Sequence, residues 1–267
     1  ELVNKEFNYF HEAKKIRDRS KRVSKACIKY IYDSTIGLFR DAMNSDHISL
    51  HANILPLMVG LKPPGGYGRI LEFIKQKRIN CGVYFSFYLL QGLFNIGEVD
   101  LAYDLITSHD RHSWFNMLQS GATTCMEAWG PEQKWNTSWC HPWSSAPIYM
   151  VSAEIMGLKP GKPGWDIINF QPSPPEKLDQ AKLTITIPTG KIKVEYQRQD
   201  EVVKYRVRIP EGSVMCCIFT DISLEVIVNG SSYECNMDKD KYGHHKVYLP
   251  RNLPAGEHMI EIRELRD

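Results

Sequence analysis

Hydrophobic residues recur at helical spacing through the first part of the chain, from residue 1 to about residue 160. In the segment 5–32, apolar residues such as Phe10, Ala13, Ile16 and Val23 fall near the period of 3.6 that predicts an amphipathic helix. The opposite side is basic, and we interpret it as a solvated face. Glycine and proline interrupt the rest of this part, and the pattern predicts further helices over 47–59, 67–77, 84–94, 98–108, 111–118 and 146–156.

Several of these helices are apolar on nearly every side, most clearly the run VYFSFYLLQGLF at 83–94. Such a helix has no face suited to water, so other helices must enclose it. Because the intervening loops are short, we expect antiparallel helical hairpins that stack in series.

The pattern changes after a segment rich in proline, residues 159–177. Beyond it, apolar and polar residues alternate with the period of two that predicts half-buried strands. We therefore expect an α then all-β chain, with a helical domain over 1–165 and an antiparallel β-sandwich over 166–267. The predicted strands centre on 183–187, 192–196, 203–209, 224–228 and 258–263.

Composition excludes several classes of protein. The net charge of +2 is too small to favour a nucleic-acid partner, and no apolar run approaches the roughly 20 residues of a membrane helix. The seven cysteines show no CxxC spacing, which favours free thiols in a reducing, cytoplasmic-like compartment over zinc or disulfide frameworks. No motif for a cofactor or metal is present. The chain begins with Glu1 rather than methionine, so we expect a piece of a longer polypeptide.

The stretch 121–143, GATTCMEAWGPEQKWNTSWCHPW, holds the strongest candidate chemistry. It combines one carboxylate in an apolar setting, Glu127, with His141 and four tryptophans, and Trp114 lies shortly before it. A buried carboxylate is costly unless a partner or a reaction uses it. Aromatic rings that stack on a sugar and acids that meet its hydroxyls are typical of a saccharide pocket.

The same stretch carries a family resemblance. GATTCMEAW at 121–129 resembles the GATT-x-x-E-x-W signature of the inverting α-L-rhamnosidases, and SWCHPWSSAP at 138–147 is similar to the segment that follows it. Further matching motifs occur in the family's order at 49–53, 59–61, 81–90, 97–102, 111–114, 157–172 and 189–196.

The resemblance implies part of an (α/α)6 barrel followed by a β-sandwich. It also implies inverting hydrolysis of terminal α-L-rhamnosyl linkages, in which Glu127 is the general base. The family's general acid lies in an earlier half of the barrel, and no segment here is similar to it. We therefore expect the acid in a missing N-terminal part and a chain that is incomplete and inactive alone.

Two further residues are candidates for substrate binding. By resemblance His141 contacts the sugar, and Trp129 is the best stacking residue because it follows Glu127 by two positions. Each has a structural alternative: Glu127 as a cap or ion-pair carboxylate, His141 as a satisfied core histidine, and Trp129 as a packing residue. Cys140 and Met126 depart from the family's usual residues, an asparagine and a tryptophan, respectively.

Two other functions stay open at this point. The chain could be a non-catalytic, sugar-binding or scaffolding remnant of such a barrel, or a helical-barrel glycosidase for another sugar. The expected partner is a rhamnose-containing oligosaccharide or glycoside. Half a barrel would also expose apolar helices, which predicts self-association or pairing with the missing part of the polypeptide.

Overall fold

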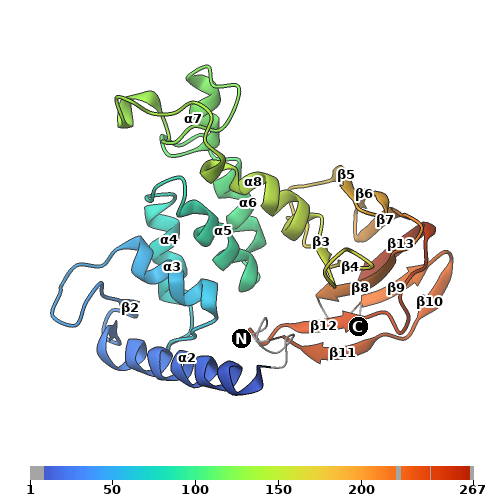
Figure 1. Cartoon of the computed structure of the whole chain (residues 1–267), viewed down its shortest axis with the longest axis horizontal. Helices are drawn as coiled ribbons and strands as arrows, with labels where there is room; N and C mark the ends of the chain where they lie inside the picture. The colour runs from blue at the N-terminus through green and yellow to red at the C-terminus, as the bar shows by residue number, and fades with distance from the viewer. Residues whose placement is uncertain (1–8, 221–223, 241, 265–267) are drawn as a thin grey trace. The chain divides into compact units, whose positions relative to one another are not determined.

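The computed structural model describes residues 9–220, 224–240 and 242–264. The chain forms two compact units, Glu1–Gly92 and Leu93–Asp267 (Figure 1). These units are defined by the packing of the chain, whereas the predicted domains 1–165 and 166–267 are defined by the change from helical to strand periodicity. The predicted domain limits therefore remain predictions.

The first unit is helical. It contains α2 (Phe10–Tyr30), α3 (Leu50–Val59), α4 (Gly68–Lys77) and most of α5 (Ser86–Asn95), together with a small hairpin of β1 (Tyr32–Asp33) and β2 (Leu38–Phe39). The predicted helix 5–32 is confirmed over Phe10–Tyr30, its first residues lie outside the described part of the chain, and Tyr32 already belongs to β1. Buried side chains of this unit include Phe39, Ile54, Leu57, Ile70, Ile74 and Leu90.

Helix α3 shows why its ends differ slightly from the prediction of 47–59. The Ser49 hydroxyl accepts a hydrogen bond from the Ala52 N–H at 3.1 Å, so the helix begins at Leu50. It ends at Gly60, which adopts the left-handed conformation with φ of 72°. Inside the helix, the side-chain amide of the fully buried Asn53 accepts a hydrogen bond from the Phe39 N–H at 2.9 Å and donates one to the Phe39 carbonyl at 3.0 Å. These two bonds tie α3 to β2.

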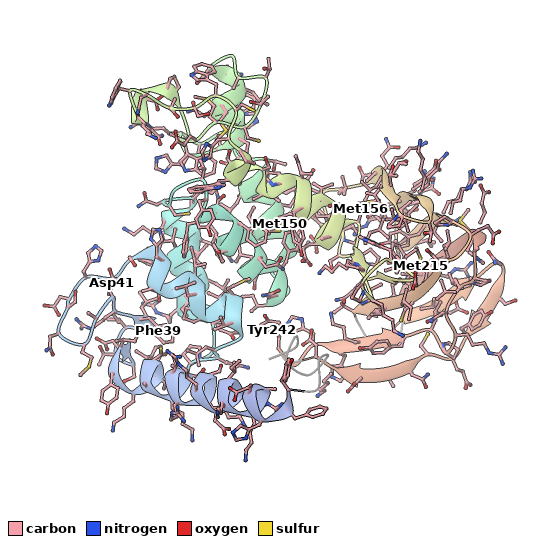
Figure 2. The ribbon with its side chains drawn as sticks, viewed as in Figure 1. Phe39, Asp41, Met150, Met156, Met215 and Tyr242 are labelled. Carbon is pink, nitrogen blue, oxygen red and sulfur yellow. The ribbon has the colours of Figure 1, made fainter. Side chains whose placement is uncertain are left out.

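The second unit begins with helices and continues into strands. After the end of α5 come α6 (Val99–Ile106), α7 (Trp114–Gln119) and α8 (Ala146–Tyr149). The predicted helix 146–156 is α-helical only at its start and continues as a π-helical segment, Met150–Ile155. Figure 2 labels Met150, at the beginning of that segment, and Met156, which follows its end.

Gly157 joins this helical segment to the first strand of the β-region. Its φ is +70°, and a Cβ atom placed there would lie 2.2 Å from backbone atoms of Gln171 and Pro172. The Gln171 N–H also donates to the Gly157 carbonyl at 2.8 Å. Only glycine satisfies both the backbone conformation and this close approach.

Two sheets form the β-region. Six antiparallel strands have the order β10-β9-β13-β7-β6-β5, and five strands have the order β11-β12-β8-β4-β3. The bounds are β3 (Leu158–Pro160), β4 (Ile167–Phe170), β5 (Gln180–Ile187), β6 (Gly190–Gln199), β7 (Val202–Ile209), β8 (Val214–Thr220), β9 (Leu224–Val228), β10 (Ser231–Tyr233), β11 (Asn236–Lys239), β12 (His245–Tyr248) and β13 (Gly256–Glu264).

The β-sandwich predicted from the sequence is confirmed, and one pair of its strands departs from antiparallel pairing. β4 and β8 are parallel, with Ile168 opposite Met215. The chain between them forms β5, β6 and β7 of the other sheet, so β8 returns to β4 from across the sandwich and in the same direction. Strand β4 and the end of β3 also lie within the proline-rich segment that the sequence suggested as a boundary.

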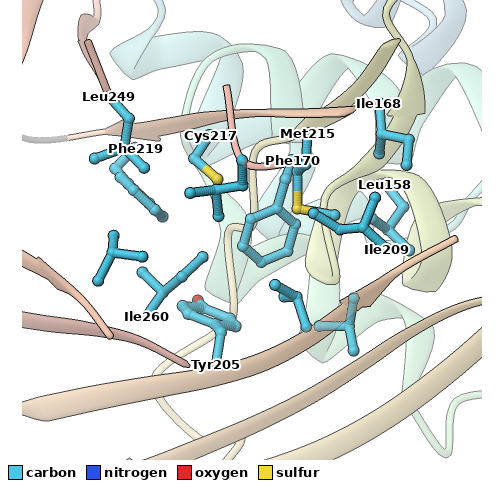
Figure 3. Close-up of a cluster of buried hydrophobic side chains, with 14 of the residues drawn as sticks. Leu158, Ile168, Phe170, Tyr205, Ile209, Met215, Cys217, Phe219, Leu249 and Ile260 are labelled. Atoms are coloured by element: carbon cyan, nitrogen blue, oxygen red, sulfur yellow. The ribbon is translucent and has the colours of Figure 1, made fainter. Parts of the chain in front are cut away.

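One hydrophobic core lies between the two sheets. Phe170 of β4 meets the Tyr205 ring of β7 edge to face at 5.2 Å and the Phe219 ring of β8 at 6.4 Å. Figure 3 shows these rings together with Met215 and Ile260, which come from opposite sheets. In the six-stranded sheet, the buried side chains include Ile192, Val194 and Tyr205, which belong to the apolar side of the alternating pattern that predicted β6 and β7.

Candidate active site

The loop between α7 and α8 brings the predicted site residues together. Its two arms are joined by backbone hydrogen bonds, from the Glu127 N–H to the Ser138 carbonyl at 2.9 Å and from the His141 N–H to the Cys125 carbonyl at 2.8 Å. The Thr124 hydroxyl adds a third link, to the Trp139 carbonyl. Positions that lie 11 to 16 residues apart in sequence are therefore neighbours.

Buried polar contacts fix this loop at its base. Met126 is fully buried, and its N–H approaches the Met117 sulfur of α7 at 3.4 Å. The buried Ser144 hydroxyl lies 2.6 Å from the Met126 carbonyl and 2.8 Å from the His141 carbonyl. Because Met126 precedes Glu127, these contacts set the position from which the carboxylate projects.

The Glu127 carboxylate has one partner on each oxygen. Lys134 Nζ lies 2.5 Å from Oε1, and the Ser138 N–H donates to Oε2 at 3.1 Å. The hydrogen bond from Lys134, followed by that from Ser138, lowers the pKa of Glu127 below its usual value. The side chain is 28% exposed rather than buried, so the carboxylate is ionised at neutral pH and open to solvent.

His141 lies near this carboxylate, and its positive form would contribute to lowering the Glu127 pKa. Its ring meets the Trp143 ring edge to face at 5.1 Å. The Nε2 atom is buried, and it makes no hydrogen bond within the described part of the chain. Buried polar atoms of this kind are rare, and each calls for an explanation. A ligand hydroxyl would provide the missing partner.

The tryptophans divide into an interior pair and an exposed set. Trp129 is only 2% exposed, because the Trp114 ring packs against it edge to face at 5.0 Å. The Trp114 Nε1–H also donates to the Ser144 carbonyl at 2.6 Å. The stacking role of Trp129 stays a prediction, although the structure places its ring in the interior. The exposed rings are Trp135, Trp139 and Trp143, at 95%, 45% and 61%.

Sequence reasoning missed two groups that bind Glu127, namely Lys134 and the Ser138 N–H. A signal for the first was present, because a carboxylate in an apolar segment requires a compensating cation. Lys134 is the only lysine or arginine in the stretch 121–143. The hairpin-like path of the loop, which brings it back to the carboxylate, has no signature in the sequence.

The described residues contain no metal site, no disulfide and no membrane-spanning helix. No group of three or more histidine, cysteine, aspartate or glutamate side chains there could hold a metal ion. None of the seven cysteines forms a disulfide, and burial raises the pKa of the Cys81 thiol to about 12. No helix in the described ranges is both long and apolar enough to cross a membrane.

Two family models match the chain. Residues 2–155 match the bacterial α-L-rhamnosidase 6 hairpin glycosidase domain, and residues 157–235 match the bacterial α-L-rhamnosidase C-terminal domain. The family resemblance predicted from the motifs is therefore confirmed. An α-L-rhamnosidase from Formosa agariphila is 29% identical over 154 residues, which are 54% of this chain and 17% of that protein. The chain thus spans about a sixth of this curated relative.

Solved structures are similar over nearly the whole chain. The α-L-rhamnosidase from Dictyoglumus thermophilum has a TM-score of 0.77 at 18% identity, and the similarity covers 98% of this chain and 30% of that one. Streptomyces avermitilis α-L-rhamnosidase complexed with L-rhamnose has a TM-score of 0.69 at 19% identity, covering 92% and 24%. At these identities the likeness establishes the fold alone. It confirms helical hairpins followed by a β-sandwich.

Proposed function

Because the chain belongs to the family of bacterial α-L-rhamnosidase 6 hairpin glycosidase domains, we propose that it acts in the hydrolysis of terminal α-L-rhamnosyl linkages, with Glu127 as the general base. The observation that supports this most is the state of the Glu127 carboxylate. It is ionised and partly exposed, and it projects from a loop that also carries His141 and three exposed tryptophans.

The geometry around Glu127 is compatible with activation of a water molecule. An ionised carboxylate offers about four lone-pair positions, and Lys134 and the Ser138 N–H occupy two of them. A water molecule can donate to a remaining position and lose its proton as it attacks the anomeric carbon. In an inverting reaction this water lies between the base and the sugar, so the product has the opposite anomeric configuration.

The lowered pKa of Glu127 has opposite effects on this chemistry. It ensures that the base is unprotonated near neutral pH, but a weaker base takes a proton with less driving force. Burial by substrate would disfavour the charged form and raise the pKa towards a more useful value. A bound sugar would therefore strengthen the base at the moment of reaction.

The other proposed roles complete the substrate site. His141 would use its unpartnered Nε2 atom to bond a sugar hydroxyl, and Trp129 would support the wall beside the base. We propose that the general acid comes from polypeptide outside these 267 residues. A rhamnose-containing substrate is supported by the Streptomyces avermitilis relative, which was solved with L-rhamnose.

Hydrolysis of an aryl α-L-rhamnoside, followed by proton NMR, tests this function. A version of the protein that includes the proposed acid-bearing segment should release the β-anomer of L-rhamnose first, while the 267-residue chain alone should turn over little substrate. First release of the α-anomer would contradict inversion. Turnover of another glycoside in preference to rhamnosides would contradict the proposed sugar.

One observation favours a second function, a non-catalytic sugar-binding remnant. Lys134 holds the carboxylate in an ion pair, as in a purely structural contact. A hydrolysis assay beside calorimetry with L-rhamnose separates the two possibilities. Both would bind the sugar, but the remnant would hydrolyse no rhamnoside, even with the rest of the polypeptide present.

A further inference from the structure

The outer face of the six-stranded sheet carries a set of cations that the proposed active site does not use. On β6, Ile192, Val194 and Tyr196 point into the sandwich core, so the alternate residues, Lys191 and Lys193 among them, point outwards. The same alternation turns the even-numbered residues of β7 outwards. We define the basic face as Lys182, Lys191, Lys193, Lys204, Arg206 and Arg208.

The strand register gathers these side chains. Lys193 lies opposite Arg208, and Glu195 lies between Lys182 on β5 and Arg206 on β7. Side chains paired across neighbouring strands stand about 5 Å apart, and those two residues along a strand about 7 Å apart. The basic face is therefore continuous across three adjacent strands, which lie side by side in Figure 1.

Two hollows lie on this face. The larger has a volume of about 510 Å³ and is lined by Lys182, Lys204 and Arg206, with Glu195, Gln180, Gln197 and Met259 beside them. A volume of this size is within the range of ligand sites, roughly 300–1,000 Å³. The second, of about 260 Å³, is lined by Lys191, Lys193, Arg208 and Pro210.

Most of these cations have no carboxylate partner. Lys182 pairs with Glu195 at 3.5 Å, and Lys204 pairs with Glu261 at 3.6 Å. By contrast, Lys191, Lys193, Arg206 and Arg208 form no ion pair with any residue in the described ranges. Four carboxylates stand on the outer side of the sheet, on Glu195, Glu225, Glu257 and Glu261, against seven cations, the six of the basic face and Arg263. The face therefore has an excess of positive charge directed to solvent.

We propose that this basic face binds an acidic polysaccharide that carries carboxylate groups along its chain. Arg206 and Arg208 would meet carboxylates with their forked donors. Gln180, Gln197 and the Glu195 carboxylate would meet hydroxyl groups in the same hollow. That the polyanion is a polysaccharide rests on the proposed glycoside hydrolase function, whereas the preference for negative charge rests on the side chains alone.

The composition of the face disfavours other polyanionic partners. Single-stranded nucleic acid requires exposed aromatic rings for base stacking, and the one ring in the larger hollow, Tyr196, is 2% exposed. A membrane surface requires large apolar side chains that insert beside the cations, and Met259 is the single large aliphatic side chain lining that hollow. A polysaccharide with repeated carboxylates requires neither exposed aromatic rings nor inserting apolar side chains, so it fits the composition of this face.

Affinity electrophoresis and calorimetry with sodium polygalacturonate test the proposal on the full chain. Fully methyl-esterified polygalacturonan is the matched ligand, because it keeps the sugar backbone and removes the charge. Polygalacturonate should bind and the ester should not. The double variant R206Q/R208Q should weaken binding by about tenfold or more, because it removes two of the forked cations that would meet carboxylates.

The matched protein control is K25Q/K29Q, which removes two charges from α2 and leaves the sheet unchanged. It should bind polygalacturonate almost as the original chain does. A second pair, K191Q/K193Q, covers the case in which R206Q/R208Q fails to fold. Equal weakening by the control, equal binding of the ester, or no binding to polygalacturonate would overturn the proposal. None of these results depends on rhamnosidase turnover, so the proposed function is tested separately.

Discussion

Lys134 and Glu127 form an ion pair in which Nζ lies 2.5 Å from Oε1. The two residues are seven positions apart, and the hairpin-like loop brings them together. Their side chains are 41% and 28% exposed, so water screens the pair, and its role is to orient and ionise the carboxylate rather than to stabilise the fold.

Substitution of Lys134 by methionine should raise the pKa of Glu127. The lysine hydrogen bond is the largest cause of the lowered value, so its loss leaves the Ser138 N–H as the main group that favours the ionised form. A carbon NMR titration of the Glu127 carboxyl measures the change. In an active version of the protein, the acidic limb of the pH–rate profile should move to higher pH by the same amount.

Lys134→Arg is the matched control, because it retains a cation at the same position. It should leave the pKa of Glu127 lower than Lys134→Met does. If the methionine variant titrates like the original chain, Lys134 is not the group that lowers this pKa.

Substitution of Gly157 by alanine should destabilise the second unit strongly. A Cβ atom there would meet backbone atoms of Gln171 and Pro172 at 2.2 Å. Gly66 is the matched control, since its φ is +73° and nothing lies within 4 Å of the added atom. Gly66→Ala should cost about 1–2 kcal/mol from backbone conformation alone. Gly157→Ala should cost a further 1–3 kcal/mol or so from steric overlap.

Urea unfolding followed by circular dichroism measures both glycine variants. The two free energies of unfolding should differ in the stated order. Equal losses would mean that the approach of the Gln171 backbone to Gly157 is not maintained in solution.

The isolated chain should self-associate through apolar helix surfaces. Leu55 and Val59 lie four residues apart on α3 and are 45% and 63% exposed, so they form part of one apolar strip. Light scattering at several concentrations should show oligomers, and a double substitution of both residues by serine should shift the distribution towards monomer. A monomer at every concentration of the original chain would show that this strip has no role in association.

Much of the fold follows from the periodicity of the sequence. The helices of the first part and the strands β5, β6, β7 and β13 lie where apolar spacing predicts them. The strand β8 (Val214–Thr220) was missed because its run VMCCIFT is apolar without alternation, and β10 to β12 were missed because they are short. The parallel pairing of β4 and β8 depends on the path of the chain between sheets, which periodicity does not encode.

The sequence singles out the residues of the candidate site but not their contacts. Glu127 and His141 stand out because a carboxylate and an imidazole occur in an aromatic-rich motif. The sequence could not show that Trp129 is buried and Trp135 is exposed, since both are tryptophans in the same irregular loop. The roles of all three stay predictions, and so does the position of the general acid.

Turnover of an aryl α-L-rhamnoside by Glu127→Gln, beside Glu132→Gln, tests the central claim most directly. Glu132 lies in the same loop and is 46% exposed, so its substitution removes a nearby carboxylate without touching the proposed base. In an active version of the protein, Glu127→Gln should lower kcat by about 10²–10⁴-fold, the usual contribution of a general base. It should still bind rhamnose, and Glu132→Gln should keep nearly full activity. Substantial activity in Glu127→Gln, or an equal loss in both variants, would contradict the assignment of Glu127.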